Sequence, residues 1–419
     1  MKADLLIQNA EEIATGQAIA DFAPAKWSVF KGTSLAAFEG KIVALGPNRQ
    51  VQETVEMADN GVTIDATGKT VTPGFVDCHT HPIFKDAREQ EFEMRVVGKS
   101  YEEIAEAGGG IRASVRSLRR ASKEQLVQAA LPRLDRFLAH GTTTIEAKSG
   151  YGLTLEDEVK SLEVIAELNR LHPLDIVPTF LGAHEIPDEY RGQTGKYLEV
   201  VINEMLPRVV ENNLAEFCDI FCEANVFSTQ EVRKLFAAAR NAGLKLKIHA
   251  DQLTANGGAS LAAEFGAVSA DHLEYTTAGD WANLLHNQVV PVLLPGAVFF
   301  IGKDKYARAR EMVKMGLPVA VATDFNPGTC MSESMPLMLT LSCLKLKLTP
   351  AETLVAATYH AALAIDRGNL LGTLEVGKKA DLVIWDIPNF KHIPYHFGVN
   401  LVRTVIKNGN IVYEIQDSR

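Results

Sequence analysis

Two histidines separated by one residue, His79 and His81, are the side chains in this sequence best suited to hold a metal ion. They follow the apolar run Val71-Thr72-Pro73-Gly74-Phe75-Val76, which predicts a buried strand. Side chains two apart on a strand point to the same side, so two imidazoles converge where the strand ends. That geometry suits a divalent metal. The alternative is a pair of polar residues in a surface loop, and the pair alone favours neither reading.

Polar residues end four further predicted strands. His184 follows the third strand, His249 ends the fifth, His272 ends the sixth, and Asp324 follows the eighth. Each could simply be a hydrogen-bonded residue where a loop begins, but their joint placement favours a single site. The remaining histidines are assigned to helices, a loop and the C-terminal β region, namely His140, His286, His360, His172, His392 and His396.

A metal site can be assembled from three imidazoles and one carboxylate: His79, His81, His249 and Asp324. This donor set suits zinc or a similar first-row ion, whereas an iron–sulfur cluster needs thiolates and Ca²⁺ an all-oxygen shell. Four protein ligands close a tetrahedral zinc, so we expect five-coordination or a weakly held Asp324. Such a carboxylate could accept the proton of a metal-activated water. We expect His272 to hydrogen-bond that water or the developing oxyanion.

The elements that position these residues alternate between strand and helix about eight times. The predicted strands end near residues 79, 147, 182, 222, 249, 272, 294 and 323. Amphipathic helices are predicted between and after them, at 123–140, 155–171, 196–212, 229–242, 259–265, 278–286, 307–315, 334–346 and 349–365. This pattern predicts a parallel (β/α)₈ barrel over residues 71–365. A doubly wound open sheet is the alternative, weakened because no glycine fingerprint follows the first strand.

The two ends of the chain are rich in short alternating segments. Strands are predicted at 5–9, 34–38 and 41–45, and again at 380–385, 402–406 and 411–413, with turns at Glu39-Gly40 and Asn408-Gly409. We expect residues 1–70 and 366–419 to form one small composite β-sandwich.

Composition limits the classes of function. The 419 residues carry a formal net charge of −10, with no long basic run, which argues against a nucleic-acid partner. No signal peptide or bilayer-spanning run is apparent, so we expect a cytoplasmic protein without a membrane partner. The five cysteines are odd in number and scattered, which favours reduced thiols; Cys218 and Cys222 are interpreted as core residues.

Taken together, these residues resemble the amidohydrolase superfamily. The resemblance rests on the Pro-Gly-Phe-Val-Asp-x-His-x-His segment at 73–81, on a histidine after strands five and six, and on Asp324 after strand eight. Binuclear members use a carboxylated lysine from strand four. Strand four here, 217–222, has no lysine, and Lys148 follows strand two. The resemblance therefore implies one divalent or trivalent ion, zinc or iron.

Within the superfamily, the chain is similar to members that open a cyclic amide carrying a propanoate in histidine degradation. Arg88, Tyr101 and the segments 108–111, 146–152, 180–184, 249–252 and 323–329 carry this similarity. It implies a hydrolase with Asp324 as general base, a small carboxylate-bearing substrate, and the homodimer common in the family. It also implies that substrate or product contacts Arg88, Tyr151, His184, Gln252, Asn326, Gly328 and Thr329.

The chemistry of two of these residues agrees with that implication. Arg88 offers a planar fork for a carboxylate, although a surface salt bridge within 86–89 is its alternative role. Gln252 stands where deaminases of the superfamily usually place a glutamate that shuttles a proton, and an amide can only hydrogen-bond the ring. Two other functions stay open: a deaminase of purines or pyrimidines, and a non-catalytic scaffold.

Overall fold

A closed parallel barrel forms the centre of the protein. The computed structural model describes residues 1–17, 22–99, 103–104 and 107–415. Eight strands lie in the order β15-β14-β13-β12-β11-β10-β9-β8 and pair in parallel. Their bounds are β8 Phe75–Asp77, β9 Thr142–Lys148, β10 Asp175–Ala183, β11 Phe217–Cys222, β12 Lys245–Ala250, β13 Ser269–His272, β14 Val290–Leu293 and β15 Ala320–Val321.

The first and last strands of this sheet meet just beyond their ends. Thr80 forms a parallel bridge with Phe325, and the Asp324 backbone N–H donates to the His79 carbonyl over 3.1 Å. The sheet is therefore closed on itself. The predicted (β/α)₈ barrel is confirmed, and the open-sheet alternative is wrong.

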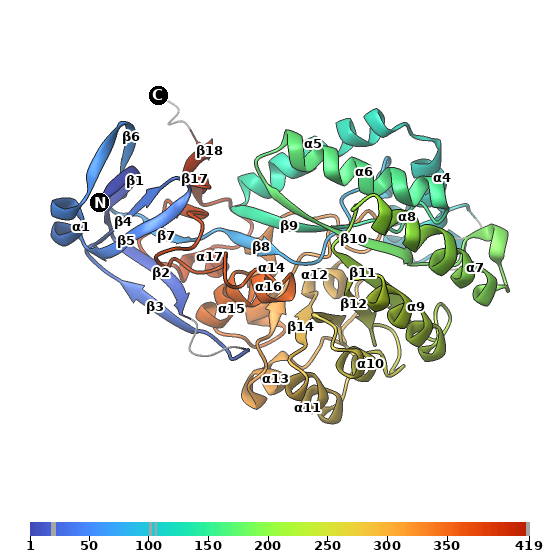
Figure 1. Cartoon of the computed structure of the whole chain (residues 1–419). Helices are drawn as coiled ribbons and strands as arrows, with labels where there is room; N and C mark the ends of the chain where they lie inside the picture. The colour runs from blue at the N-terminus through green and yellow to red at the C-terminus, as the bar shows by residue number, and fades with distance from the viewer. Residues whose placement is uncertain (18–21, 100–102, 105–106, 416–419) are drawn as a thin grey trace.

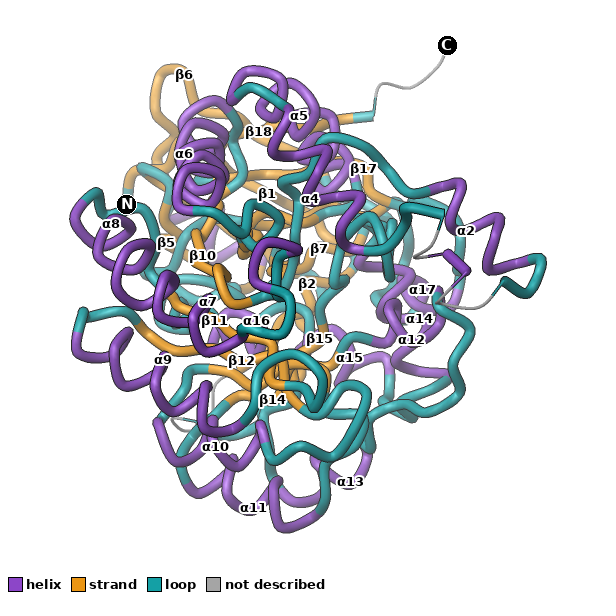
Figure 2. Tube along the Cα trace, turned by 90° about the vertical axis from the view of Figure 1, so that its right-hand side faces the viewer, coloured by secondary structure: helices purple, strands orange, loops and turns teal. Residues whose placement is uncertain are grey.

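Helices surround the barrel, as Figure 2 shows for α6, α9, α10, α11 and α13 at the periphery. Each buries an apolar face against the strands while its polar face meets solvent. Between the strands lie α2 Glu89–Val96, α4 Ile111–Arg120, α5 Lys123–Ala139, α6 Leu155–Leu171, α7 Thr194–Val200, α8 Leu206–Glu211, α9 Thr229–Asn241, α10 Gly258–Phe265, α11 Ala278–His286, α12 Pro295–Phe300 and α13 Ala309–Met315. After β15 come α14 Met335–Leu344, α15 Pro350–Ala356 and α16 Tyr359–Ala364.

Two helices predicted as continuous are interrupted. The helix predicted at 196–212 contains a π-helical turn, Val201–Met205, between α7 and α8. Pro207 in the first turn of α8 has no N–H to donate, and the wider turn before it accommodates the proline ring. The helix predicted at 349–365 breaks between α15 and α16, because the Ala357 carbonyl accepts a hydrogen bond from Val76 of β8 instead.

The two ends of the chain build a β-sandwich beside the barrel, as Figure 1 shows where blue and red strands adjoin. A four-stranded sheet, β5-β4-β1-β6, faces a six-stranded sheet, β18-β17-β16-β7-β2-β3, across a shared core that includes Leu5, Leu35 and Leu382. The bounds are β1 Lys2–Ala10, β2 Glu12–Gln17, β3 Lys26–Phe30, β4 Thr33–Phe38, β5 Lys41–Pro47, α1 Asn48–Thr54, β6 Glu56–Asp65, β7 Thr70–Pro73, β16 Leu382–Trp385, α17 His392–Tyr395, β17 Val402–Lys407 and β18 Asn410–Glu414.

The sandwich extends the prediction in three places, because strands β2, β3 and β6 were not expected. The single strand predicted over residues 71–76 is divided between β7 of the sandwich and β8 of the barrel. His392 begins the short helix α17 within the C-terminal β region. The composite character is confirmed, because β7 pairs with β16. The boundaries at residues 70 and 366 stay a prediction.

The sandwich holds the strand that leads to the predicted metal ligands His79 and His81. Gly74 links β7 to β8, and its N–H donates to the Asp381 carbonyl over 3.0 Å. Lys407 of β17 lies 2.8 Å from Asp175 at the start of β10 and 2.5 Å from Asp381. The Gly74 hydrogen bond therefore holds the start of β8 against the C-terminal strands, and Lys407 joins the same strands to β10.

Two further predictions can be compared with the structure. All five cysteines are free, as expected for reduced thiols. Among the described residues, no helix combines the length and apolarity needed to cross a bilayer.

Candidate metal centre and active site

Five predicted polar residues meet at the carboxyl ends of the barrel strands. His79 and His81 follow β8, His249 lies in β12, His272 ends β13, and Asp324 follows β15; all five are at most 3% exposed. The backbone is unusual at two of them, with φ of 80° at His272 and 54° at Asp324. Positive φ is costly for residues other than glycine and tends to occur at functional sites.

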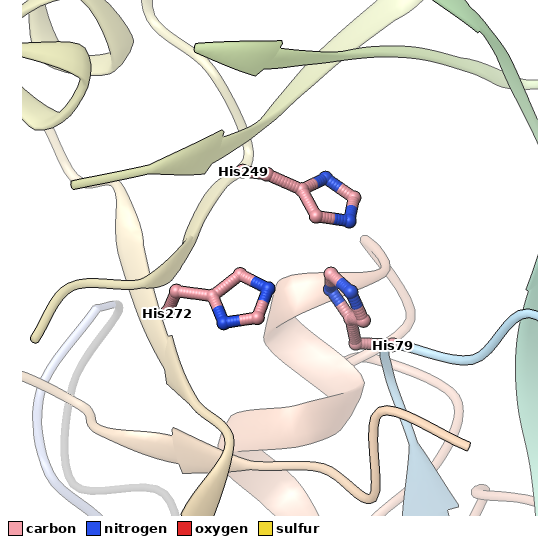
Figure 3. Close-up of side chains that lie close together, drawn as sticks. All are labelled: His79, His249 and His272. Carbon is pink, nitrogen blue, oxygen red and sulfur yellow. The ribbon is translucent and has the colours of Figure 1, made fainter. Parts of the chain in front are cut away.

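Four donor atoms converge in this cluster. The Nε2 atom of His81 lies 3.3 Å from Nε2 of His79 and 3.4 Å from Nε2 of His249. Oδ1 of Asp324 lies 3.6 Å from Nε2 of both His79 and His81. Ligands held at bond lengths of about 2.0–2.1 Å around one tetrahedral ion are separated by roughly 3.4 Å. Figure 3 shows His79, His249 and His272 with their rings turned toward one another.

The three imidazoles are held neutral, as metal binding requires. Burial holds the pKa of His79 and of His81 well below the usual range, and it lowers the pKa of His249 to about 3. Nδ1 of His79 donates to Asp271 over 2.6 Å, and Nδ1 of His249 lies 3.1 Å from Asp219. The Nε2 lone pairs of His79 and His249 are therefore directed toward the shared space. These residues fit a single metal ion.

Asp324 and His272 are poised for proton chemistry beside that space. Burial raises the pKa of Asp324 to about 6, although His272 opposes this shift. Burial alone would lower the pKa of His272, but the carboxylates of Glu274, Asp324 and Asp271 outweigh it and raise that pKa. Nδ1 of His272 lies 3.9 Å from Glu274. The imidazole thus keeps a proton that it can donate.

His184 and Tyr151 form one wall beside the predicted metal ligand His81. The His184 ring stacks on His81 with centroids 5.1 Å apart, and Nδ1 of His184 donates to the Gly150 carbonyl over 2.9 Å. Tyr151 is buried, with its ring 5.4 Å from His184 and 6.0 Å from His81. Burial raises the pKa of Tyr151, and both Arg88 and Asp324 are close enough to influence it. The phenol is therefore close to both Asp324 and Arg88.

Arg88 packs on the loop that follows Asp324. Its Nε and Nη2 atoms donate to Glu91 over 2.8 and 2.6 Å. The alternative role of Arg88, a salt bridge, is therefore present, but with Glu91 rather than within 86–89. Its Nη1 atom lies against Gly328, where a β-carbon would overlap it. The guanidinium of Arg88 and the loop that contains Gly328 therefore lie on the same side of the site.

Asn326 shapes that loop through its side chain. Its Oδ1 accepts from the N–H groups of Gly328 and Thr329, and its Nδ2 donates to the Asp324 carbonyl and to Thr329 Oγ1. The hydroxyl of Thr329 in turn lies 3.5 Å from Oδ2 of Asp324. The loop thus couples the backbone beside Arg88 to the carboxylate at the centre.

Gln252 is partly exposed, like Arg88, His184 and Thr329. It lines a narrow cleft with Glu274, Tyr275 and Lys305. Glu274 connects this cleft to His272. Tyr101 lies outside the described residues.

Comparison with known proteins places this arrangement in a family. A sequence model described as the amidohydrolase family matches residues 70–412. The chain belongs to the amidohydrolase family. Relatives within it are imidazolonepropionases. The imidazolonepropionase of Alkaliphilus metalliredigens is 47% identical to this protein, over 93% of this chain and 90% of the relative's chain. That of Alkaliphilus oremlandii is 45% identical over 99% of both.

Solved structures share the fold of this amidohydrolase at low sequence identity. An adenosine deaminase from Xanthomonas campestris with bound zinc has a TM-score of 0.73 at 18% identity and covers 100% of this chain and 95% of its own. A 5-methylcytosine deaminase from Klebsiella pneumoniae has the same TM-score and identity, with 98% of both chains covered. The resemblance inferred from the sequence is confirmed, and the chain is a hydrolase.

Beneath the ligand cluster of this amidohydrolase lies a layer of buried charges that the sequence interpretation missed. Two ammonium groups, Lys148 and Lys247, alternate with three carboxylates, Glu146, Asp219 and Asp271, and each side chain is 0% exposed. A sequence signal existed, because Asp219 and Lys247 stand in the middle of strands that are otherwise mostly apolar. Lys247 stands two residues before His249 on β12, and therefore points to the same side.

Proposed function

We propose that this amidohydrolase opens the ring of 4-imidazolone-5-propanoate with water to give N-formimidoyl-L-glutamate, a step of histidine degradation in the cytoplasm. The observation that carries the proposal is the convergence of three imidazole nitrogens and one carboxylate beside an arginine. The names of relatives 45–47% identical to the chain support the substrate. The free cysteines agree with a reducing compartment.

The residues divide into those that hold a metal ion and those that act on water and substrate. His79, His81, His249 and Asp324 would hold one zinc or iron ion. When bound, such an ion acidifies water and polarises a carbonyl. Asp324 accepts the proton of the attacking water, for which its raised pKa suits it. The water oxygen adds to the ring carbonyl carbon, and His272 donates a hydrogen bond to the developing oxyanion.

Ring opening follows when the bond from that carbon to the ring nitrogen breaks. Asp324 delivers the proton to the departing nitrogen, so the carbonyl becomes a carboxylate and the nitrogen becomes part of the formimidoyl group. Arg88 binds the propanoate, and Tyr151, His184, Asn326, Gly328 and Thr329 line the ring. Gln252 hydrogen-bonds the ring at the outer edge and has no carboxyl group with which to shuttle a proton, which favours hydrolysis over deamination.

The proposal is tested by mixing the purified protein with 4-imidazolone-5-propanoate and following loss of its ultraviolet absorbance. Mass spectrometry should find a product heavier than the substrate by one water, and metal analysis of the same sample should find about one ion per chain. Ammonia should not be released. No turnover of this compound, or ammonia release from a panel of purines and pyrimidines, would contradict the proposal.

Replacing Arg88 with methionine should raise KM while leaving kcat nearly unchanged. A hydrogen bond to a charged group contributes about 1.5–3 kcal/mol, which corresponds to roughly 10- to 100-fold in KM. Steady-state kinetics check this. The matched control is R120M, because Arg120 lines the same outer cleft as Arg88 but its Nε donates to the Arg116 carbonyl. Equal effects of the two variants would argue that Arg88 does not contact the carboxylate.

Replacing Gly328 with alanine should also raise KM, but less than R88M does, because the change displaces Arg88. The new methyl group overlaps Nη1 of Arg88, which is the end of a flexible side chain and can move at little cost in folding. We expect KM to rise about tenfold with an unchanged melting temperature, as measured by kinetics and thermal unfolding. In a protein that already carries R88M, the Gly328 substitution should raise KM hardly any further. A full additional tenfold there would show that Gly328 acts independently of Arg88.

A further inference from the structure

Lys148 holds a central position in the buried charge layer under the metal centre. Its Nζ atom lies 2.7 Å from Oδ2 of Asp219 and 3.7 Å from Oδ2 of Asp271. The same Asp219 oxygen lies 3.1 Å from Nδ1 of His249, and the same Asp271 oxygen accepts from Nδ1 of His79 over 2.6 Å. One ammonium group therefore contacts both carboxylates that orient two of the proposed metal ligands.

This arrangement is charged and fully enclosed. Lys148, Asp219 and Asp271 are all 0% exposed. Burial alone would lower the pKa of Lys148, but Asp219, Glu146 and Asp271 raise it instead, so the amine keeps its proton. In a dry interior an unpaired carboxylate is strongly destabilised, and it moves when its counter-ion is removed. Such a movement would release the histidine that the carboxylate holds.

We infer that Lys148 is a positioning residue of the metal centre, which fixes the rings of His79 and His249 through Asp271 and Asp219. The inference rests on the proposed metal site. In this role Lys148 does not contact the substrate. Partners of metal-bound histidines typically contribute about 10- to 100-fold to metal affinity, because they fix the tautomer and the ring orientation. Lys148 acts one step farther out, on two histidines at once.

The opposite sign is expected if Lys148 acts by charge alone. A cation near a metal ion repels it, so removing the ammonium would then tighten metal binding. If Lys148 instead orients the two carboxylates, its removal weakens metal binding. The direction of the change in affinity therefore separates the two roles.

The test compares K148M with K247M. Lys247 is equally buried in the same layer, and its charge also lowers the pKa of Asp271. It lies 2.9 Å from Glu146 and donates to the Cys78 carbonyl, but among the described residues it forms no ion pair with Asp219 or Asp271. Affinity for Zn²⁺ is measured by competition with a chelator, and the visible spectrum of the Co²⁺-loaded proteins reports ligand geometry. We expect K148M to bind Zn²⁺ about 10- to 100-fold more weakly with an altered cobalt spectrum, and K247M to change less than about threefold. Unchanged or tighter binding by K148M, or equal losses in both variants, would overturn the inference.

A second pair of variants covers failure of K148M to fold. K148M/D271N restores the charge balance of the layer, and it is compared with D271N alone. Because Asp219 and His249 remain, K148M should still weaken Zn²⁺ binding about tenfold in this background. No further loss there would overturn the inference. If the wild-type protein itself binds no metal, the proposed function is wrong. If the wild type binds metal and K148M binds it equally tightly, only the role inferred for Lys148 is wrong.

Discussion

D324N should turn over 4-imidazolone-5-propanoate at least about 10³-fold more slowly than the wild type, because an amide cannot take the proton of the attacking water. The side chain is of equal size and sits in a loop fixed by Asn326, so the fold should be retained. The measurement is kcat from the absorbance assay, together with circular dichroism and metal content. A variant that keeps a tenth of the wild-type rate would show that Asp324 is not the base.

The pH dependence of the wild type checks the same role. Burial raises the pKa of Asp324 to about 6, and only the ionised form accepts a proton. Activity should therefore fall as the pH drops through this pKa, and the charge of a bound ion can only move the fall to lower pH. In D324N, the remaining activity should no longer show this fall at low pH, which is the acid limb of the pH profile.

D251N is the matched control for D324N. Asp251 also follows a barrel strand and also has a positive φ, of 52°. Its carboxylate accepts from the backbone N–H groups of Asn256, Gly257 and Ala259, so it caps a turn instead of facing the metal space. D251N should lower the melting temperature and leave the acid limb of the pH profile in place.

Removal of the metal should abolish turnover, to below about 1% of the loaded protein, and one equivalent of Zn²⁺ or Fe²⁺ should restore it. The reason is that the described residues around the site supply no other group able to acidify water at neutral pH. The melting temperature should fall as well, because an ion that binds only the folded state stabilises it by about 4 kcal/mol at a thousand times its dissociation constant. Full activity in a sample shown to be metal-free would contradict the proposed mechanism.

Two histidine variants separate ligation from substrate contact. H249Q should lose the metal, because it removes one of the converging Nε2 atoms. H184Q should keep it, since Nδ1 of His184 donates to the Gly150 carbonyl and the ring stacks on His81 from outside the donor set. Metal content by elemental analysis gives the answer. Loss of metal in both variants would show that the proposed set of metal ligands is incorrect.

The barrel could be predicted from sequence because its strands are short apolar runs that end in polar residues. β12 is an example: it ends at Ala250, next to the predicted His249. Periodicity alone could not predict where a tertiary contact diverts a helix, as the Ala357 carbonyl does between α15 and α16. The break depends on Val76, which lies far away in the sequence.

The ligand cluster was predictable for the same reason, whereas its supporting layer was not recognised. His79, His249 and Asp324 are conspicuous at strand ends. Lys148 and Asp219 lie within strands, where a single charge gives no indication of its partner 71 residues away. The position of Arg88 against Gly328 also depends on a loop packing that spacing does not encode.

The pairing of β7 with β16 has a consequence for synthesis on the ribosome. β7 leads directly into β8, which ends just before His79, yet the neighbour of β7, β16, is translated about three hundred residues later. The nascent chain therefore exposes the segment that carries His79 and His81 long before β16 is available to pair with β7. A chain truncated ahead of residue 382 would retain every proposed ligand and still lack the strand that holds the first two in place.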